Sequence, residues 1–330
     1  METSRADVAI IGAGLIGTSI AWRLSQAGAQ VTLFDAGRLG GQASSAGAGM
    51  LSPGGEFDRP SRWLDLGIEG IRLYPSFVDE LRGETKLPID FRICGCLQLA
   101  ASEEERSQAH ARTEFQSRAG IRVEMTADGL FYPDDGLVDP NDLLRALRCA
   151  GESRKVRILE NQPIGEIESS NHDAVVIAAG AWSEQIRVTC KNQPVMLPRT
   201  IPVKGHLIGF QLAAGTLGPM RRHGHIYVLQ RSNGFTIAGS NEEQAGFDRS
   251  LNYDVCAEIH QKAARLFPVL TNTTPTKSWF GFRPYSPGGP HIGRVTGTNV
   301  WLAYGHYRNG ILLAPLTAQR VAGDILNNRV

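Results

Sequence analysis

The chain has 330 residues, with 34 Lys and Arg against 33 Asp and Glu. This length allows one large α/β unit or two interleaved domains, and a net charge of +1 provides no overall field to attract nucleic acid or anionic lipid. No apolar run reaches the ~18 residues of a membrane span, and the start lacks a signal-peptide pattern. The five cysteines contain no CxxC pair. We therefore expect a cytoplasmic protein with reduced thiols and no nucleic-acid or membrane partner.

The first 35 residues predict a strand, a glycine turn, a helix and a second strand. Apolar residues fill 7–11 and 30–34, with helical spacing between them. The turn carries three glycines, Gly12, Gly14 and Gly17. In a dinucleotide turn these bend the chain, let backbone N–H groups approach a pyrophosphate, and let the helix pack on the strand. Asp35 ends the second strand, where an acid can accept hydrogen bonds from a ribose and argues against a 2′-phosphate.

A segment rich in small residues follows, from Arg38 to Met50. Such a composition is also typical of a flexible surface loop. The absence of charge over 42–51 and the Met50-Leu51 end favour burial instead. This segment can therefore lie along an extended ligand.

Helices and strands continue through the middle of the chain. Apolar spacing predicts a helix over 60–82, strand-like runs near 89–100, and a polar helix over 102–119. Asp139 and Pro140 open another helix, as a capping carboxylate and a proline at the first helical position. The run 175–180 is apolar on both faces, which is typical of a central parallel strand.

The last third predicts an antiparallel sheet followed by a helix. Alternating segments occur between 199 and 282, and the last 20 residues form an apolar helix. Pro315 requires that helix to begin just before it, near Gly310. Because nucleotide-binding signals occur at the start, middle and end, the chain must cross between two lobes several times.

Arg283 is a candidate ligand-binding residue. It stands among aromatic and apolar residues in Trp279-Phe280-Gly281-Phe282-Arg283-Pro284. A buried guanidinium needs an anion, and the residues alone leave open an internal carboxylate or that of a substrate. His225 and Tyr227 would share one face of a strand and so could point into one pocket. A metal site is not expected, because no third ligand has suitable spacing.

Several segments resemble the D-amino acid oxidase family of FAD-dependent oxidoreductases. They are the glycine turn with Asp35, the Ala-Ser-Ser segment ending in Ala-Gly-Met, and 178–183. The segment 281–293 matches the family's Gly-x-Arg-Pro followed by Pro-x-Ile-Gly. The segment 305–315 is similar, nearly residue for residue, to the signature of the glycine oxidase branch. The chain departs from the family at His206, where Gln usually follows the glycine.

The resemblance implies an α/β fold in which a Rossmann-like FAD-binding domain is interleaved with a smaller α+β substrate domain built on an antiparallel sheet. The FAD-binding domain would comprise 1–82, 135–198 and 280–330, and the substrate domain 83–134 and 199–279. Residues expected to bind FAD, held non-covalently, are Gly12, Gly14, Leu15, Ile16, Gly17, Asp35, Ala36, Ser44, Ser45, Ala46, Gly49, Met50, Ala179, Gly180, Trp182, His306, Tyr307, Arg308, Asn309, Gly310, Ile311 and Leu312.

The resemblance also implies roles at the substrate end. Arg283 would pair with the carboxylate of an amino acid, Tyr227 would donate a hydrogen bond to it, and His225 would line the pocket. Arg308 would be a second basic residue there, although a cap or a salt bridge between the lobes is the alternative. Unpaired N–H groups at Gly310 and Ile311, at the start of the final helix, would face the flavin pyrimidine edge.

The implied activity is oxidation of glycine or another small amino acid by hydride transfer to flavin, without a catalytic base. Dioxygen would be the acceptor, and the products would be the oxo acid, ammonia and hydrogen peroxide. The resemblance further suggests a homo-oligomer and a supply of glycine imine for thiamine thiazole synthesis. Alternatives are an oxidase of sarcosine, proline or larger D-amino acids, a dehydrogenase with a protein acceptor, and a flavin-binding protein without turnover. An NAD dehydrogenase is disfavoured, because nothing resembles its nicotinamide half.

Overall fold

A six-stranded sheet forms the centre of one lobe in the computed structural model, which describes residues 7–56 and 59–328. Its strands, in spatial order, are β19 (His291–Arg294), β20 (Val300–Tyr304), β11 (Ala174–Ile177), β1 (Asp7–Ile11), β2 (Gln30–Phe34) and β9 (Arg157–Leu159). All neighbours are parallel except β19, which is antiparallel to β20. The fully buried β11 has Ala and branched residues on both faces, as a strand covered on both sides requires.

Two layers cover the six-stranded sheet. On one face, β1, β2, β11 and β20 pack against α1 (Leu15–Gln26) and α8 (Ala314–Asn327). On the other face lies a three-stranded sheet of β10 (Glu166–Glu168), β12 (Arg187–Cys190) and β13 (Gln193–Val195). The helices α4 (Arg62–Thr85) and α6 (Pro140–Ser153) pack on α1 and α8 as an outer layer. The short turns η1 (Ser169–Asn171) and η2 (Gly180–Gln185) flank β11.

An eight-stranded sheet dominates the second lobe. Its strands, in spatial order, are β18 (Lys277–Tyr285), β14 (Ile201–Gln211), β17 (Phe235–Gly239), β16 (Ile226–Gln230), β15 (Met220–His223), β5 (Cys96–Leu99), β7 (Gly129–Tyr132) and β6 (Glu124–Thr126). Only the β15–β5 pair is parallel. The helix α7 (Tyr253–Leu266) and η3 (Pro268–Asn272) pack near one end, and α5 (Glu103–Arg118) packs near the other.

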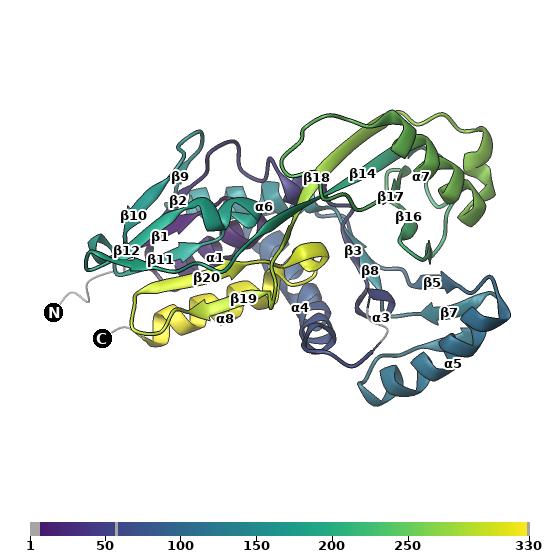
Figure 1. Ribbon diagram of the computed structural model, residues 1–330, viewed down its shortest axis with the longest axis horizontal. Helices are drawn as coiled ribbons and strands as arrows, with labels where there is room; N and C mark the ends of the chain where they lie inside the picture. Colours follow the sequence, from purple (N-terminus) through teal and green to yellow (C-terminus); the bar gives the residue numbers. More distant parts are fainter. Residues whose placement is uncertain (1–6, 57–58, 329–330) are drawn as a thin grey trace.

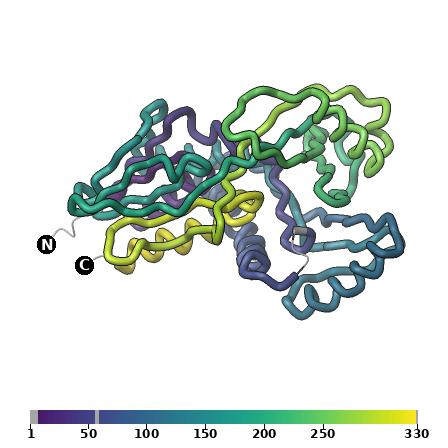
Figure 2. Tube along the Cα trace, viewed as in Figure 1, coloured from purple at the N-terminus to yellow at the C-terminus, as the bar shows by residue number. Residues whose placement is uncertain are grey.

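A third, small sheet and two short helices lie where the lobes meet. The sheet contains β3 (Met50–Leu51), β8 (Gly136–Val138) and β4 (Phe91–Ile93), and the helices are α2 (Ala43–Ala46) and α3 (Pro53–Glu56). Figure 1 shows β14 and β18 extending from the region of the six-stranded sheet into the second lobe. In Figure 2 the purple start and the yellow end of the chain lie in the same lobe, and blue and green segments form the other.

The α/β architecture predicted from the sequence is confirmed, and the bounds of two elements differ from those predicted. The final helix begins at Ala314, and Pro315 occupies its first turn, where a missing N–H costs nothing. Residues 310–313 form a turn after η4 (Tyr307–Asn309), so the helix does not begin near Gly310. The strand expected over 175–180 ends at Ile177, because Gly180 has a φ of +57° and opens η2. The domain boundaries expected at 83 and 280 fall inside α4 and β18.

Two simpler features of the described residues are the hydropathy of the helices and the state of the cysteines. None of the helices in 7–56 and 59–328 combines the length and hydropathy needed to cross a lipid bilayer. All five cysteines are unpaired thiols, and burial raises the pKa of Cys96.

Candidate active site

A cavity of about 600 Å³ extends from the carboxyl ends of β1 and β2 to the face of β14 and β18. This volume is within the range of small-molecule and cofactor sites. Every residue expected to bind the cofactor lines it, except Gly17 and Ser45. The side chain of Ser45 instead donates to the carbonyl of Gln42 (3.3 Å).

The turn after β1 is possible because Gly12 and Gly17 have no side chain. Gly12 has a φ of +110°, and a Cβ there would lie 2.4 Å from the carbonyl oxygen of Ala178 on the neighbouring strand. A Cβ at Gly17 would lie 1.9 Å from the carbonyl oxygen of Gly12. Gly17 is therefore required for packing the helix on the turn and does not reach the cavity.

The N-terminus of α1 presents backbone N–H groups at the cavity. Gly14 is the N-cap residue, and a Cβ there would meet only the hydroxyl of Ser44, at 3.2 Å. That hydroxyl accepts the N–H of Leu15 (2.9 Å). Among the described residues, the N–H groups of Ile16 and Gly17 donate to no acceptor. The positive end of the helix is thus available to an anionic group such as a phosphate.

Asp35 lines the cavity at the same end as the N-terminus of α1. Its two carboxylate oxygens accept the N–H groups of Ala13 and Gly37, each at 2.8 Å. A carboxylate has about four acceptor positions, so capacity for ligand hydroxyls remains. The loop 162–165, after β9, also lines this end, and Gln162 donates its N–H to the carbonyl of Asp35 (2.8 Å). Sequence reasoning missed this loop, although its place after a parallel strand was the available signal.

The turn at residues 310–312 presents a second set of free N–H groups. Within the part of the chain that the structure describes, the N–H groups of Gly310, Ile311 and Leu312 donate to no acceptor, and all three residues line the cavity. The buried hydroxyl of Tyr74 on α4 donates to the carbonyl of Ile311. The C=O and N–H of one peptide unit point in opposite directions, so this bond turns the N–H of Leu312 away from α4. Burial raises the pKa of Tyr74, which keeps the hydroxyl protonated as a donor.

His306 and Tyr307 begin the same segment. The ring of His306 is fully buried against the hydroxyl of Thr317 (2.9 Å), and burial lowers its pKa to about 3. It is therefore neutral near pH 7. Tyr307 has a φ of +50°, and burial together with a hydrogen bond to Glu242 raises its pKa to about 12.

Arg283 projects from β18 into the opposite end of the cavity. Its Nη1 donates to the carbonyl of Asn241 (3.1 Å) and its Nη2 to the hydroxyl of Ser240 (2.7 Å). Burial lowers its pKa, but a guanidinium stays charged in proteins. Arg283 forms no ion pair with a carboxylate anywhere in the described ranges. The internal salt bridge that the sequence left open is absent there, although the carboxylate of Glu242 is near enough to interact electrostatically with the guanidinium.

Gly205 and Gly281 create the space for this arrangement. They are register partners on β14 and β18. A Cβ at Gly205 would lie 2.2 Å from Nη2 of Arg283, so the guanidinium rests against bare backbone. A Cβ at Gly281 would lie 2.7 Å from Cβ of Ala46, where α2 crosses the sheet. Sequence reasoning missed Gly205 because a glycine within a strand carries no signal for a contact with a residue 78 positions away.

Tyr227 lines the cavity, whereas His225 lies outside it. Tyr227 is buried on β16, lines the cavity and interacts electrostatically with Arg283. His225 is exposed in the turn before β16 and does not line the cavity. Gly224, with a φ of +55°, begins that turn, so the alternation of a strand does not extend to His225. The expectation of a shared face was wrong.

Arg308 lines the cavity, and its positive charge is paired with the carboxylate of Glu242. Its Nη1 lies 2.9 Å from the carboxylate of Glu242 and 3.4 Å from Nδ1 of His225. Burial would raise the pKa of Glu242, but hydrogen bonding to Tyr307 and the charge of Arg308 outweigh it and lower the pKa. Glu242 follows β17, so the pair joins the 305–312 segment to the eight-stranded sheet. This is the salt bridge between lobes that the sequence left as the alternative.

Comparisons with known proteins identify the family of the chain. Residues 7–323 match the family model DAO, described as FAD dependent oxidoreductase. A glycine oxidase of Geobacillus kaustophilus is 31% identical over 97% of this chain and 93% of that protein. A bifunctional protein ThiO/ThiG of Synechocystis is 32% identical over 100% of this chain, which spans 53% of that longer protein. The crystal structure of glycine oxidase from Geobacillus kaustophilus has a TM-score of 0.89 and 29% identity, covering 99% of this chain and 96% of that one. The resemblance predicted from the sequence is confirmed, and the chain belongs to the DAO family of FAD dependent oxidoreductases.

Proposed function

We propose that this protein oxidises glycine or another small amino acid, with FAD bound in the central cavity and dioxygen as the electron acceptor. The observation that carries the proposal is Arg283. Its buried guanidinium donates to two neutral acceptors and forms no ion pair with a carboxylate among the described residues, although the nearby charge of Glu242 interacts with it. It faces the same cavity as the free N–H groups of 310–312. A small carboxylate would supply the missing anion.

The residues present fit FAD. Free N–H groups at the start of α1 suit a pyrophosphate, and Asp35 beside them suits a ribose. Gly14 leaves the backbone at the start of α1 without a side chain, so a ligand can approach it closely. When bound, FAD supplies the acceptance of hydride and the subsequent reaction with dioxygen.

The chain itself supplies position and charge. Arg283 provides a planar fork for a carboxylate, and Tyr227 provides a hydroxyl on the same cavity wall. Two-point attachment of the carboxylate would fix the orientation of the α-carbon, which lowers the entropic part of the barrier. The N–H groups of 310–312 are suited to stabilise negative charge on a bound ring system. Because the hydrogen would leave the α-carbon of the neutral-amine substrate as hydride, no residue is needed to remove a proton from that carbon.

The proposal is tested with the purified protein. We expect a flavin absorbance spectrum, bleaching by glycine without oxygen, and hydrogen peroxide formation with oxygen. Parallel titrations with sarcosine, D-alanine and D-proline identify the preferred substrate among these small amino acids. A spectrum that bleaches without peroxide formation would instead indicate a dehydrogenase with another acceptor, and a flavin that no amine bleaches would refute the activity.

The variant Arg283→Ala tests the carboxylate role directly. Loss of a charge-assisted, desolvated pair costs on the order of 2–5 kcal/mol, so the KM for the amino acid should rise by roughly 30-fold or more. Flavin binding should persist, because the expected FAD-binding positions remain intact. Arg294→Ala is the matched control, since Arg294 is exposed on β19 outside the cavity. An unchanged KM in Arg283→Ala would remove the role.

A further inference from the structure

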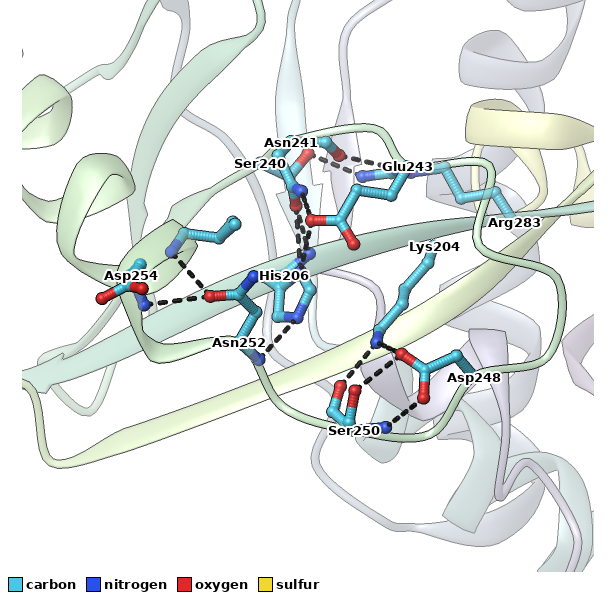
Figure 3. Close-up of polar contacts among 11 residues, drawn as sticks. Lys204, His206, Ser240, Asn241, Glu243, Asp248, Ser250, Asn252, Asp254 and Arg283 are labelled. Atoms are coloured by element: carbon cyan, nitrogen blue, oxygen red, sulfur yellow. Dashed lines mark hydrogen bonds and ion pairs between the residues drawn. The ribbon is translucent and has the colours of Figure 1, made fainter.

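The acceptors that hold Arg283 belong to a loop that is fixed from the opposite face of the sheet. Figure 3 shows Arg283 beside Ser240 and Asn241, with His206 and Lys204 reaching the same loop from β14. Along β14, Lys204 and His206 alternate with Gly205, so they point away from the face on which the guanidinium lies. Their side chains are 1% and 0% exposed.

The ring of His206 makes two hydrogen bonds to the loop, and its Nδ1 also lies 3.6 Å from the carboxylate of Glu243. The N–H of Asn252 donates to Nε2 of His206 (3.2 Å), and Nδ1 of His206 lies 3.2 Å from Oδ1 of Asn241. A backbone N–H can only donate, so Nε2 is the acceptor, and burial lowers the pKa of His206, which favours the neutral ring. The proton then resides on Nδ1, which donates to Asn241.

Asn241 connects this contact to Arg283. Its Oδ1 also accepts the backbone N–H of His206 (2.7 Å), and its side-chain amide donates to Glu243. The main-chain carbonyl of the same residue accepts Nη1 of Arg283 (3.1 Å). Asn241 is therefore anchored through its side chain on one side and orients the guanidinium through its carbonyl on the other.

Lys204 fixes the far end of the same loop. Its ammonium group donates to Asp248 (2.8 Å) and to the carbonyl of Ser250 (2.5 Å), and it lies 4.8 Å from the ring centre of Phe280. With this end held, the ring of His206 and the carboxylate of Glu243 are the groups that contact the side chain of Asn241, and the ring is the one that comes from the sheet.

We propose that His206 is a positioning residue for Arg283, acting through Asn241. The ring holds the carbonyl of Asn241 where the guanidinium fork faces the cavity, and carboxylate affinity depends on that contact. This inference rests on the proposed function, because the ligand of the fork is taken to be a carboxylate.

Two substitutions separate the two hydrogen bonds of His206. In His206→Asn, the amide nitrogen occupies the place of Nδ1 and can still donate to Asn241, while the contact with Asn252 is lost. In His206→Gln, the amide reaches the place of Nε2 and can still accept from Asn252, while the donation to Asn241 is lost. Each variant loses one bond of similar length, so a purely structural role would affect both alike.

The measurement is the dissociation constant of acetate, titrated into the flavin-loaded protein and followed by the flavin absorbance. We expect His206→Gln to weaken acetate binding by about tenfold, with a parallel rise in KM for glycine, and His206→Asn to remain within about threefold of the wild type. Unfolding midpoints of the two variants should be similar. His260→Gln is the control, because the ring of His260 bonds the carbonyl of Leu270 outside this network.

The outcomes are distinguishable. If His206→Gln binds acetate like the wild type, or if both variants weaken binding equally, the positioning role is overturned. If Arg283→Ala binds acetate as tightly as the wild type, the proposed function fails, whatever the His206 variants do.

Discussion

Gly205→Ala should impair substrate binding, and the whole effect should come from displacement of Arg283. Gly205 lies within β14 and is not among the glycines with positive φ, so alanine can adopt its backbone conformation. The added Cβ would lie 2.2 Å from Nη2, 2.4 Å from Nη1 and 2.5 Å from Cζ of Arg283. Non-bonded heavy atoms settle at about 3.5 Å or more, so the guanidinium must retreat by roughly 1.3 Å.

A retreat of this size exceeds the tolerance of the hydrogen bonds that Arg283 makes or would make to a carboxylate. One lost bond to a charged group costs about 1.5–3 kcal/mol, which corresponds to a rise in KM of roughly 10- to 150-fold. The assay is steady-state peroxide formation against glycine concentration. Gly83→Ala is the matched control, because a Cβ at Gly83 meets no atom within 4 Å.

A double-mutant cycle tests the route of this effect. In the Arg283→Ala background, the same Gly205→Ala substitution should add almost nothing, because the clashing group is gone. A KM for Gly205→Ala within twofold of the wild type would refute the reasoning. So would an effect that persists undiminished in the double variant.

Three further predictions concern the other wall of the cavity. Arg308→Ala should raise KM less than about tenfold, since Glu242 already matches its charge at 2.9 Å; a hundredfold rise in the peroxide assay would contradict this. Tyr74→Phe leaves the carbonyl of Ile311 without its buried donor and should lower the free energy of unfolding by about 1–3 kcal/mol in urea titrations, whereas no loss would show that bond to be unimportant. The pKa of His306 falls from 6.5 to about 3 on folding, so between these pH values the unfolded chain binds a proton that the folded chain does not. Stability is therefore lost as the pH falls through this window, by up to ~1.4 kcal/mol per pH unit, and His306→Asn should remove that slope; a parallel pH dependence of the two proteins would contradict the assignment.

Sequence patterns were sufficient to predict the elements whose conformation depends on residues close together in the chain. The strand, glycine turn and helix over 7–26 follow from apolar periodicity and from glycine spacing, and Asp139 with Pro140 predicts the start of α6. Pro315 correctly predicts a helix that begins just before it. It does not predict that 310–312 form a separate turn, because that conformation depends on Tyr74, more than 200 residues away.

The surroundings of Arg283 could not be predicted for the same reason. Ser240 and Asn241 are 43 and 42 positions away, and their contact with Arg283 exists only once β14, β17 and β18 are paired. The error over His225 arose from extending strand alternation across a turn that Gly224 makes. Side-chain directions alternate only within a strand, so the predicted direction of a residue fails when that residue lies in the turn just before the strand.

The order of strands in the six-stranded sheet has a consequence for biosynthesis. The strand β20 is made after β11, with which it pairs near the centre of the sheet, and α8 is made after α1, which it covers. A ribosome that has delivered only the first 290 residues therefore leaves the edge of β11 and an apolar face of α1 uncovered. At that point the cavity also lacks its 303–312 wall. Completion of the FAD-binding lobe, and capture of the cofactor with it, must follow synthesis of β20 and α8, so a chain that stops before them should aggregate rather than form a smaller flavoprotein.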